Sequence, residues 1–508
     1  MSNRSPCSNR GAELLSLLLL VSLLIGCAEQ PDAVLRVGLS SAPATLDPRH
    51  ATDAAAARLC RLLYASPVDF DAAFRPQPAL MTWEMHAPEH YVFRLRGEAF
   101  FHDGTPIRAE DVAATYRSVL DPAQASPFRG ALAHIISLEA TSPKTLEVRL
   151  SRPDPLFPGL LTLGVLPARE LEQARRTSAY TGSGGFRLAA EFNPQHVQLV
   201  RQVDGQRVDF LVVPNETTRA LKVSRGELDL VQGGMSPELT AWLSRQPGIT
   251  VRRVKGTVYT YLGFNLHSGP TRDLRVRQAI AHAIDRDALV RHAFKAQARL
   301  ADGVLVPEHW AGVPDPERLR HDPARSRSLL SELGYGPADP LELTYKTSND
   351  FFRRRIATIL QDQLAAVGIR LEIRSHDWGT FFGDIRRGDF QVYALSWVGL
   401  QLPDIFRQAF HSASVPPTGA NRGRYASAEM DALIEQAERA PDEAARAAGY
   451  RAVQRLLGRD LPYVSLWFED IVVVQGARVV GYDTNLNGHY DGLLETRLAL
   501  DEHRAAPH

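Results

Sequence analysis

Lysine is almost absent from this chain of 508 residues. Nearly all of the 58 basic side chains are arginines, and 58 acidic residues balance them; the lysines are Lys144, Lys222, Lys255, Lys295 and Lys346. A net charge of zero provides no basic field for nucleic acid or for an anionic membrane surface. The length and composition instead predict a globular protein of about two to four domains.

Cysteine is equally scarce. Cys7 and Cys27 lie near the N-terminus, so Cys60 stands alone in the body of the chain and no internal disulfide can form there. The spacing matches no zinc site. Because Cys60 lies in an apolar pattern of helical period, we expect it to be a small buried apolar residue.

Common catalytic motifs are missing as well. The chain has no Walker A motif, no dinucleotide-binding glycine fingerprint and no His-Glu-x-x-His motif. Residues 181–185 (TGSGG) lack the first glycine of a nucleophile elbow. We therefore expect a protein that is not an enzyme and holds no cofactor, with a hydrolase as the alternative.

The N-terminus has the pattern of an export signal. Arg4 and Arg10 precede an apolar run over residues 14–25, which is long enough for a signal-peptide core and shorter than the ~20 residues of a spanning helix. The run ends in Leu24-Ile25-Gly26-Cys27, which resembles a bacterial lipobox. This resemblance implies a signal peptide over 1–27, a tether over 28–33 and lipid on Cys27. An ordinary signal peptide with a chance cysteine is the alternative.

The periodicity of apolar residues predicts alternating strands and helices. In the second half, strands at 341–345, 369–373 and 390–397 alternate with helices at 352–367 and 381–387, which predicts a mainly parallel sheet with right-handed crossovers. A helix over 429–457 should break near Pro441. The first half predicts strands at 34–40, 91–96, 145–150, 208–214 and 228–231, and helices at 109–120 and 216–225.

An ordered set of segments resembles one family. The set consists of residues 44–48 (ATLDP), 100–112 (FFHDGTPIRAEDV), 182–188 (GSGGFRL), 261–265 (YLGFN), 276–286 (VRQAIAHAIDR), 377–381 (DWGTF) and 388–390 (GDF). Together with the lipobox, they are similar to the family 5 extracellular solute-binding proteins of ABC importers, which include oligopeptide-, dipeptide- and nickel-binding proteins. The resemblance runs from about Val34 to the C-terminus.

The resemblance implies a two-lobed α/β fold of the large periplasmic-binding-protein type (cluster C). Domain I would be discontinuous, with residues 34–256 and 475–508, and a hinge would link it to domain II, residues 257–474. A small solute would bind between the lobes and shift the population toward a closed form. The implied partners are an ABC permease with its ATPase, and the implied state is a monomer held at the periplasmic side of the envelope by the lipid. A receptor lipoprotein without transport is an alternative of another class.

Three of these segments also have a structural interpretation. His102 lies in a turn (HDGTP), where glycine and proline set the chain direction, so we expect a structural histidine. Asp285 should end one helix and cap the next. Residues 261–265 look like a strand that crosses between lobes, with a glycine where a neighbour or ligand comes close.

The candidate ligand-binding residues are Trp397, Gln401, Asp404, Tyr261 and Asn265. Peptide-binding members of the family carry an aspartate, after the motif tryptophan, that pairs with the peptide's amino terminus. Here Leu402 lies at or near that position and Asp404 follows two residues later. Because a buried amine without a carboxylate is costly, either Asp404 takes this role or the ligand is not a free-amine peptide. Trp397 would be an apolar wall or a ring facing a cation.

These departures leave the solute class open. The chain passes quickly through residues 195–200 to Val208, so the rim of domain I is shorter than the family usually has. A peptide remains the first expectation, and a metal chelate or an opine is the alternative. We expect no metal site; the weak calcium-loop candidate has oxygens at Asp483, Asn485, Asn487 and Asp491, but leucine occupies position 494 where a bidentate glutamate is expected. His411 lies near the expected cleft without a histidine cluster around it.

Overall fold

The computed structural model describes residues 34–172, 180–314 and 319–499. The predicted signal peptide, the tether and Cys27 lie outside the described residues. Within them, no helix is long and apolar enough to cross a membrane.

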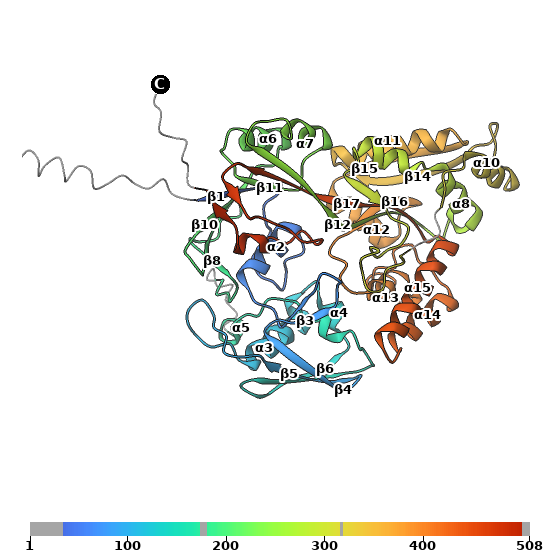
Figure 1. Ribbon diagram of the computed structural model, residues 1–508. Coiled ribbons are helices and arrows are strands. Elements are labelled where there is room, and N and C mark those ends of the chain that lie inside the picture. Colours follow the sequence, from blue (N-terminus) through green and yellow to red (C-terminus); the bar gives the residue numbers. More distant parts are fainter. Residues whose placement is uncertain (1–33, 173–179, 315–318, 500–508) are drawn as a thin grey trace, which may run out of the picture.

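One large mixed sheet runs through the molecule (Figure 1). Its strands lie in the order β15 (Ile369–His376), β14 (Leu341–Ser348), β16 (Val392–Trp397), β12 (Ile249–Phe264), β17 (Tyr463–Gly476), β11 (Leu230–Gln232), β1 (Leu35–Leu39), β10 (Arg207–Val212), β9 (His196–Arg201) and β8 (Phe186–Leu188). A further strand, β13 (Ala298–Leu300), pairs with β17.

Strand directions confirm part of the expectation. β14 is parallel to β15 and β16, as the strand–helix–strand run predicts, and β1 is parallel to β10 and β11. The expectation of a mainly parallel sheet is wrong for the sheet as a whole, because β12 and β17 pair antiparallel with each other and with their outer neighbours. These two long strands join the two parallel groups.

The β12–β17 ladder contains an irregularity. Its register shifts between Val254 and Val258 and again between Thr260 and Tyr261. Bulges of this kind bend a strand and increase its local twist. The first shift surrounds residues 256 and 257, where the sequence analysis puts the domain boundary, and that boundary stays a prediction.

A second, smaller sheet forms the lower part of the molecule in Figure 1. It is antiparallel, in the order β4 (Met81–Ala87), β5 (His90–Leu95), β7 (Thr145–Leu150) and β6 (Ile135–Ser142), and α3 (Ala109–Leu120) packs on it. The bounds of α3 are those predicted, and the Asp111 carboxylate accepts a hydrogen bond from the Arg108 amide at its start. The short strands β2 (Val68–Phe70) and β3 (Pro76–Pro78) form a hairpin beside this sheet, and β18 (Val479–Val480) pairs with β19 (Arg497–Leu498).

The helices surround the sheets. The regular helices are α2 (Ala54–Leu63), α4 (Arg129–Leu132), α5 (Ala168–Glu172), α6 (Glu216–Ser224), α7 (Pro237–Leu243), α8 (Leu274–Ala283), α9 (Arg286–Ala288), α10 (Pro323–Glu332), α11 (Phe351–Ala365), α12 (Trp378–Arg387), α13 (Ile405–Phe410), α14 (Ala428–Glu438) and α15 (Glu443–Asp460). Single turns of other helix types occur at Pro122–Gln124, Phe157–Leu160, Pro270–Arg272, Leu289–Ala293, Ser412–Ser414 and Asp491–Leu494.

Several local expectations are confirmed. The predicted break near Pro441 separates α14 from α15. Asp285 follows α8, and its carboxylate accepts a hydrogen bond from the Ala288 amide at the start of α9. Cys60 is a buried free thiol on α2. His102 is held in its turn, where its Nε2 lies 3.0 Å from the Gly184 carbonyl oxygen.

Candidate functional site

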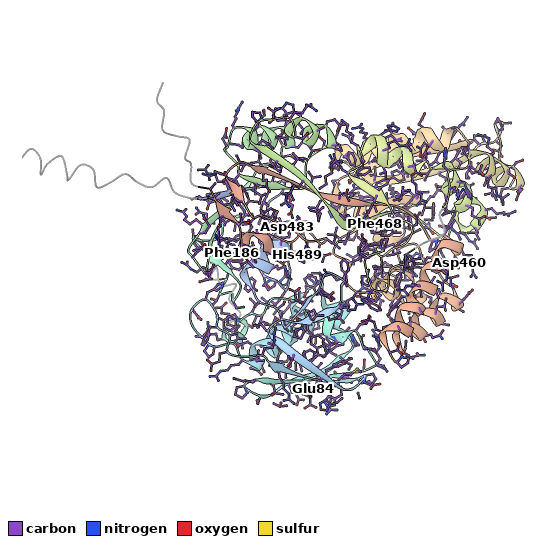
Figure 2. The ribbon with its side chains drawn as sticks, viewed as in Figure 1. Glu84, Phe186, Asp460, Phe468, Asp483 and His489 are labelled. Carbon is purple, nitrogen blue, oxygen red and sulfur yellow. The ribbon has the colours of Figure 1, made fainter. Side chains whose placement is uncertain are left out.

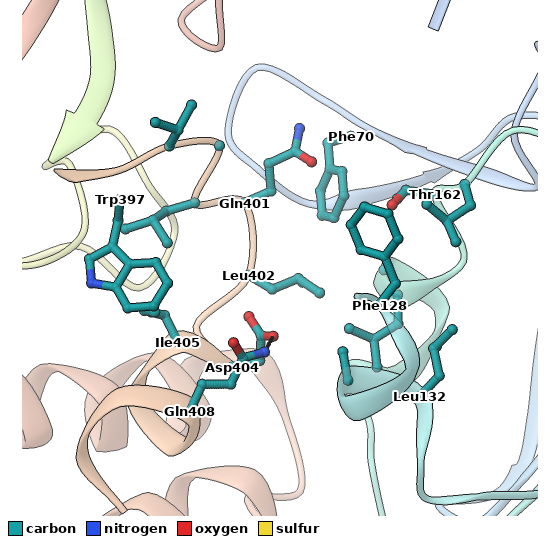
Figure 3. Close-up of a pocket in the computed structure, with 17 residues that line it drawn as sticks. Phe70, Phe128, Leu132, Thr162, Trp397, Gln401, Leu402, Asp404, Ile405 and Gln408 are labelled. Carbon is teal, nitrogen blue, oxygen red and sulfur yellow. Dashed lines mark hydrogen bonds between the residues drawn. The ribbon is translucent and has the colours of Figure 1, made fainter. Parts of the chain in front are cut away.

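A pocket of about 300 Å³ lies between two segments that are distant in sequence (Figure 3). The first wall comes from the small-sheet side of the molecule: Phe70, Phe128, Ala131, Leu132, Gly159, Leu160, Thr162 and Leu163. The second wall is the end of β16, the loop after it and α13: Trp397, Val398, Gly399, Leu400, Gln401, Leu402, Asp404, Ile405 and Gln408. Among these lining residues there is no lysine, arginine or histidine, and Asp404 is the single ionisable group.

Three of the five predicted candidates meet in this pocket. Trp397 is the last residue of β16, and Gln401 and Asp404 follow it in the loop that leads into α13. Figure 3 shows the three on the same wall, facing Phe128 across the pocket. The strand fixes the start of the loop and the helix fixes its end, so both sides of this wall are anchored in regular structure.

The Asp404 carboxyl group has no cationic partner among the described residues. One of its oxygens accepts a hydrogen bond from Gln408 Nε2 at 2.7 Å. Burial in the apolar pocket raises the pKa of Asp404 to about 7, and the negative charges of Asp154 and Glu438 act in the same direction. An acid of this kind is neutral or charged near pH 7 according to what lies next to it.

Leu402 brings the two walls into contact. Its side chain is buried and reaches Gly159 of the opposite wall, where a Cβ on the glycine would come within 2.8 Å of Leu402 Cδ2 and 3.1 Å of Pro76 Cγ. The absence of a side chain at Gly159 therefore lets the walls approach. At Leu402, where the sequence analysis expects the family's aspartate position, the structure has an apolar contact between the walls.

His309 supports the loop from behind. Its Nδ1 accepts a hydrogen bond from the Ala311 amide at 3.0 Å, so Nε2 carries the proton and donates to the Gln401 carbonyl oxygen at 3.1 Å. The ring stacks on Phe74 with 5.2 Å between centroids. Burial lowers the pKa of His309 to about 4, which keeps the ring neutral and this tautomer in place.

Trp397 faces a cation on the protein itself. The Arg422 guanidinium lies 4.7 Å from the centre of the Trp397 ring and 5.4 Å from that of Phe382. Its Nη1 donates a hydrogen bond to the Tyr261 hydroxyl at 3.1 Å. The interpretation of Trp397 as a cation-facing ring thus has a basis in the fold, but the sequence analysis missed Arg422, because no motif or spacing connects a loop arginine with this tryptophan.

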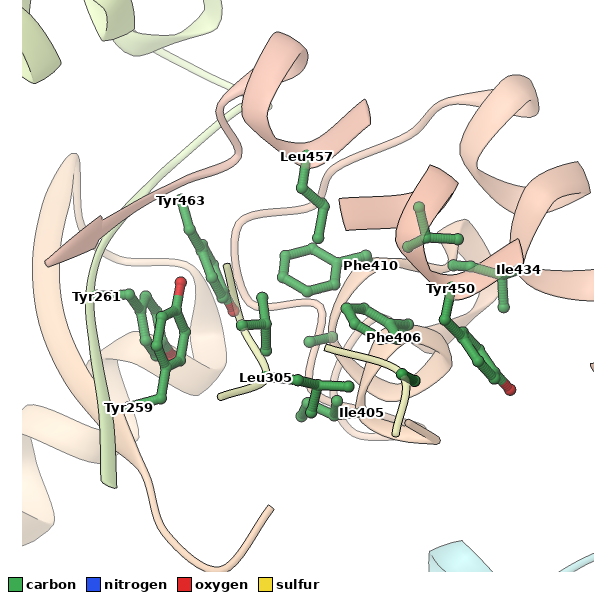
Figure 4. Packing of buried hydrophobic residues seen from close by; sticks show 14 of the residues in the cluster. Tyr259, Tyr261, Leu305, Ile405, Phe406, Phe410, Ile434, Tyr450, Leu457 and Tyr463 are labelled. Carbon is green, nitrogen blue, oxygen red and sulfur yellow. The ribbon is translucent and has the colours of Figure 1, made fainter. Parts of the chain in front are cut away.

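The other two candidates lie outside the pocket. Tyr261 is fully buried in β12, where its ring stacks on Tyr463 at 3.9 Å between centroids (Figure 4). The Asn265 amide is bound by backbone: its Nδ2 donates to the carbonyl oxygens of Gly388 and Phe390, and its Oδ1 accepts from the amides of His267 and Ser268. The fold uses all of these polar atoms of Asn265. Gly263 between them makes room for a side chain, since a Cβ there would lie 2.5 Å from the ring of Tyr393.

The calcium-like loop is held by internal partners. Asp483 and His489, labelled in Figure 2, both belong to the loop after β18. Both Asp491 oxygens accept hydrogen bonds from Arg61 Nε at 2.9 Å, and Asp483 pairs with Arg252 at 3.2 Å. Asn485 bonds back to its own turn and Asn487 accepts from Thr257.

No group of three or more His, Cys, Asp or Glu side chains suited to a metal ion occurs in the described ranges. His411 therefore belongs to no such metal-binding group. It is buried, and its ring nitrogens lie 3.5 Å from a Glu435 carboxylate oxygen and 3.8 Å from an Asp431 carboxylate oxygen. The calcium hypothesis gains no support from the structure.

Comparison with known proteins agrees with this architecture. Residues 73–414 match the bacterial extracellular solute-binding proteins, family 5 Middle. The probable deoxycholate-binding periplasmic protein YgiS of Escherichia coli K12 is 26% identical over 89% of this chain and 91% of its own length.

Two solved structures share the fold. The Campylobacter jejuni protein NikZ in complex with Ni(L-His) superposes with a TM-score of 0.79 at 21% identity, over 92% of this chain and 100% of that chain. Helicobacter pylori DppA in complex with the peptide STSA gives 0.79 at 24% identity, over 92% and 98%. The chain therefore belongs to the family 5 bacterial extracellular solute-binding proteins, and its fold is that of periplasmic binding proteins.

Proposed function

We propose that the pocket between the two walls captures a small solute, which the protein then delivers to an ABC permease. The observation that carries this proposal is the convergence of Trp397, Gln401 and Asp404 on one apolar pocket that two distant segments line. Concave, mainly apolar pockets with a few polar groups are typical ligand sites. Residues from both walls would contact the solute, so its binding would favour the closed arrangement.

The proposed solute is a short peptide with apolar side chains. The walls offer apolar surface, and the unpaired carboxyl group of Asp404 offers an acceptor for a peptide amine. An ammonium group there would lower the pKa of Asp404 and form a charge-assisted pair in a low-dielectric site. The solved structure of the H. pylori relative DppA holds a peptide, which supports the same class. A metal chelate or an opine is the alternative.

Calorimetric titration with two peptides tests this proposal. We expect Leu-Phe to bind more tightly than N-acetyl-Leu-Phe, because acetylation removes the charge that Asp404 would pair with. The preference should grow from pH 5 to pH 7 as Asp404 loses its proton. Asp404→Asn should remove the preference, whereas Glu342→Gln, which removes an exposed carboxylate paired with Arg370, should keep it. Equal binding of both peptides would contradict the amine role, and no binding of either would contradict peptide capture.

We also propose that the protein stands at the periplasmic side of the envelope, tethered through lipid on Cys27. The lipobox at residues 24–27 supports this, and E. coli YgiS is named as a periplasmic protein. Several acyl chains provide stable anchoring, since each buried methylene contributes ~0.8 kcal/mol. Cys27→Ser should accumulate as unacylated, uncleaved precursor by mass spectrometry, while Cys7→Ser should mature normally. Normal acylation of Cys27→Ser would overturn the proposal.

A further inference from the structure

Behind Trp397 lies a cluster of hydrogen-bond donors that contains no carboxylate. It consists of Arg422, Tyr261, Tyr393, Tyr463 and Trp397, which come from β12, β16, β17 and the loop before α14, and we call it the donor cluster. The strands bring its members together: β12 pairs with both β16 and β17, and Tyr261 lies 3.9 Å from Tyr463 and 5.9 Å from Tyr393 between ring centroids.

Three donors of the cluster are buried without a well-aligned partner. The Trp397 indole nitrogen and the hydroxyls of Tyr393 and Tyr463 make no well-aligned hydrogen bond within the described residues, although the hydroxyls of Tyr261, Tyr393 and Tyr463 lie close enough to interact with one another. The whole side chain of Tyr393 is fully buried and that of Tyr463 is 7% exposed. Buried polar groups are nearly always paired in folded proteins, so an unpaired indole beside poorly aligned hydroxyls and an arginine without a carboxylate indicates a missing acceptor.

Arg422 adds a positive charge that no described carboxylate balances. Its recorded contacts are the faces of Trp397 and Phe382 and the hydroxyl of Tyr261, and the three tyrosines lie within electrostatic range of it. No hydrogen bond from Nε or Nη2 of Arg422 is seen within the described residues, which leaves these donors for another group. A guanidinium edge matches the two oxygens of a carboxylate.

The donor cluster adjoins the solute pocket. Trp397 belongs to both, since the ring lines the pocket and also carries Arg422 on one face. The pocket supplies apolar walls and the Asp404 carboxyl group but has no cation in its lining. The two regions are therefore complementary: one can take an apolar body and an amine, and the other can take an anion.

We propose that the donor cluster is the subsite that receives the carboxylate of the solute whose body occupies the pocket. This inference rests on the proposed capture of a solute there. Arg422 forms the charge-assisted pair, and the hydroxyls of Tyr393 and Tyr463 and the Trp397 indole donate to the remaining lone pairs. The solute then carries an amine toward Asp404 and a carboxylate toward Arg422, as an unmodified short peptide does.

A set of four ligands tests the carboxylate subsite separately from the pocket. The set is Leu-Phe, Leu-Phe-amide, N-acetyl-Leu-Phe and N-acetyl-Leu-Phe-amide, each titrated by calorimetry. The native protein should bind each acid at least about tenfold more tightly than its amide. Arg422→Gln should bring this ratio close to one and leave the amine preference in place, while Asp404→Asn should do the reverse.

Two variants control for a merely structural effect. Arg424→Gln removes a cation of the same loop, one that donates to the Arg387 carbonyl oxygen, and should keep the acid-to-amide ratio. Arg422→Lys keeps the positive charge but loses the two parallel N–H donors of the guanidinium, so it should give an intermediate acid-to-amide ratio. A native acid-to-amide ratio near one, or an unchanged ratio in Arg422→Gln, would overturn the subsite even if all four ligands bind.

A second measurement applies if none of the four ligands binds, in which case peptide capture fails on its own. Benzoate and inorganic phosphate, titrated against the native protein and Arg422→Gln, then probe the anion site directly. Saturable benzoate binding that Arg422→Gln abolishes would support the subsite, and phosphate binding alone would identify an inorganic anion in its place. Absence of both would overturn the proposal and leave ordered water as the acceptor.

Discussion

The loop over residues 483–491 and the donor cluster behind Trp397 are both rich in polar groups, yet they differ in how those groups are used. In the loop, Asp491 and Asp483 pair with Arg61 and Arg252, and the asparagines bond to nearby groups. In the donor cluster, an arginine has no carboxylate and three buried donors have no well-aligned hydrogen bond among the described residues. From the residue types alone, the loop looks like a ligand site. The hydrogen bonds point to the donor cluster instead, because the polar groups of the loop already have partners within the protein.

The same contrast separates the acids of the molecule. Arg61 pairs with both Asp491 and Asp69, which are half-buried. Partial burial would raise the pKa of Asp69, but the pairing with Arg61 outweighs it and the pKa is lowered. Asp404 lies in an apolar pocket with two other acids nearby, and its pKa is raised to about 7. A paired acid stabilises the fold at neutral pH, whereas an unpaired acid costs stability there and becomes useful when a ligand supplies the cation.

Removing the unpaired acid should have the largest effect. The folded pKa of Asp404, about 7, lies above the ordinary value of 3.8, so the folded state holds a proton that the unfolded chain releases. The resulting stabilisation is fully present below the ordinary pKa and is lost as the pH rises through 7, at up to about 1.4 kcal/mol per pH unit. Asp404→Asn should therefore gain stability over the native protein between about pH 4 and 7. Urea unfolding at pH 5 and pH 8 measures the free energy of unfolding of both proteins. The same difference between Asp404→Asn and the native protein at both pH values would contradict the prediction.

Disturbing the packing between the two pocket walls should have the second-largest effect on stability. Gly159→Ala places a methyl group 2.8 Å from Leu402 and 3.1 Å from Pro76, and the overpacking should cost about 1–3 kcal/mol and weaken peptide binding. Leu402→Ala in the same chain should relieve part of this cost, because it removes the clashing methyl groups. A double-mutant cycle by urea unfolding and calorimetry measures the coupling, and strictly additive effects would show that the walls do not touch in solution.

Substitutions in the loop over residues 483–491, whose polar groups already have partners, should change stability less. Asp491→Asn removes the charge that Arg61 pairs with, but both groups are partly exposed, so we expect a loss of about 1 kcal/mol or less in the free energy of unfolding. Ligand affinity should not change. Asp483→Asn, at a more exposed pair, should cost still less. A loss of peptide binding in Asp491→Asn would bring this loop into the functional site and break the comparison.

Calcium should have the smallest effect, which is none. The loop oxygens already have partners, and an ion that binds only the folded state would raise the melting temperature with its concentration. We expect unchanged melting temperatures in millimolar calcium and in EDTA. A saturable rise with calcium, lost in Asp491→Asn, would revive the calcium-loop hypothesis.

Local structure was largely predictable from the sequence. The bounds of α3, the cap at Asp285 and the break at Pro441 depend on interactions within a few residues, and such signals are visible in one sequence. The mixed direction of the large sheet was not predictable in the same way. It depends on β12 and β17, whose pairing joins segments from different halves of the chain.

The candidate site was predictable in part. Trp397, Gln401 and Asp404 lie within eight positions of one another, so a single loop brings them together once its motif is recognised. The raised pKa of Asp404 depends on Asp154 and Glu438, and the role of Trp397 depends on Arg422, all of which arrive through tertiary folding. Tyr261 is near the site through Arg422 rather than in the pocket, and Asn265 has its bonds to the backbone.

The shared strands β12 and β17 have a mechanical consequence. Because two paired strands cross from one group of parallel strands to the other, any relative motion of the walls must twist this ribbon. The register shift between Val254 and Val258 is the wider of its two irregularities, since residues 255–257 have no partner in the ladder. Torsion between the two parallel groups should therefore concentrate at this section.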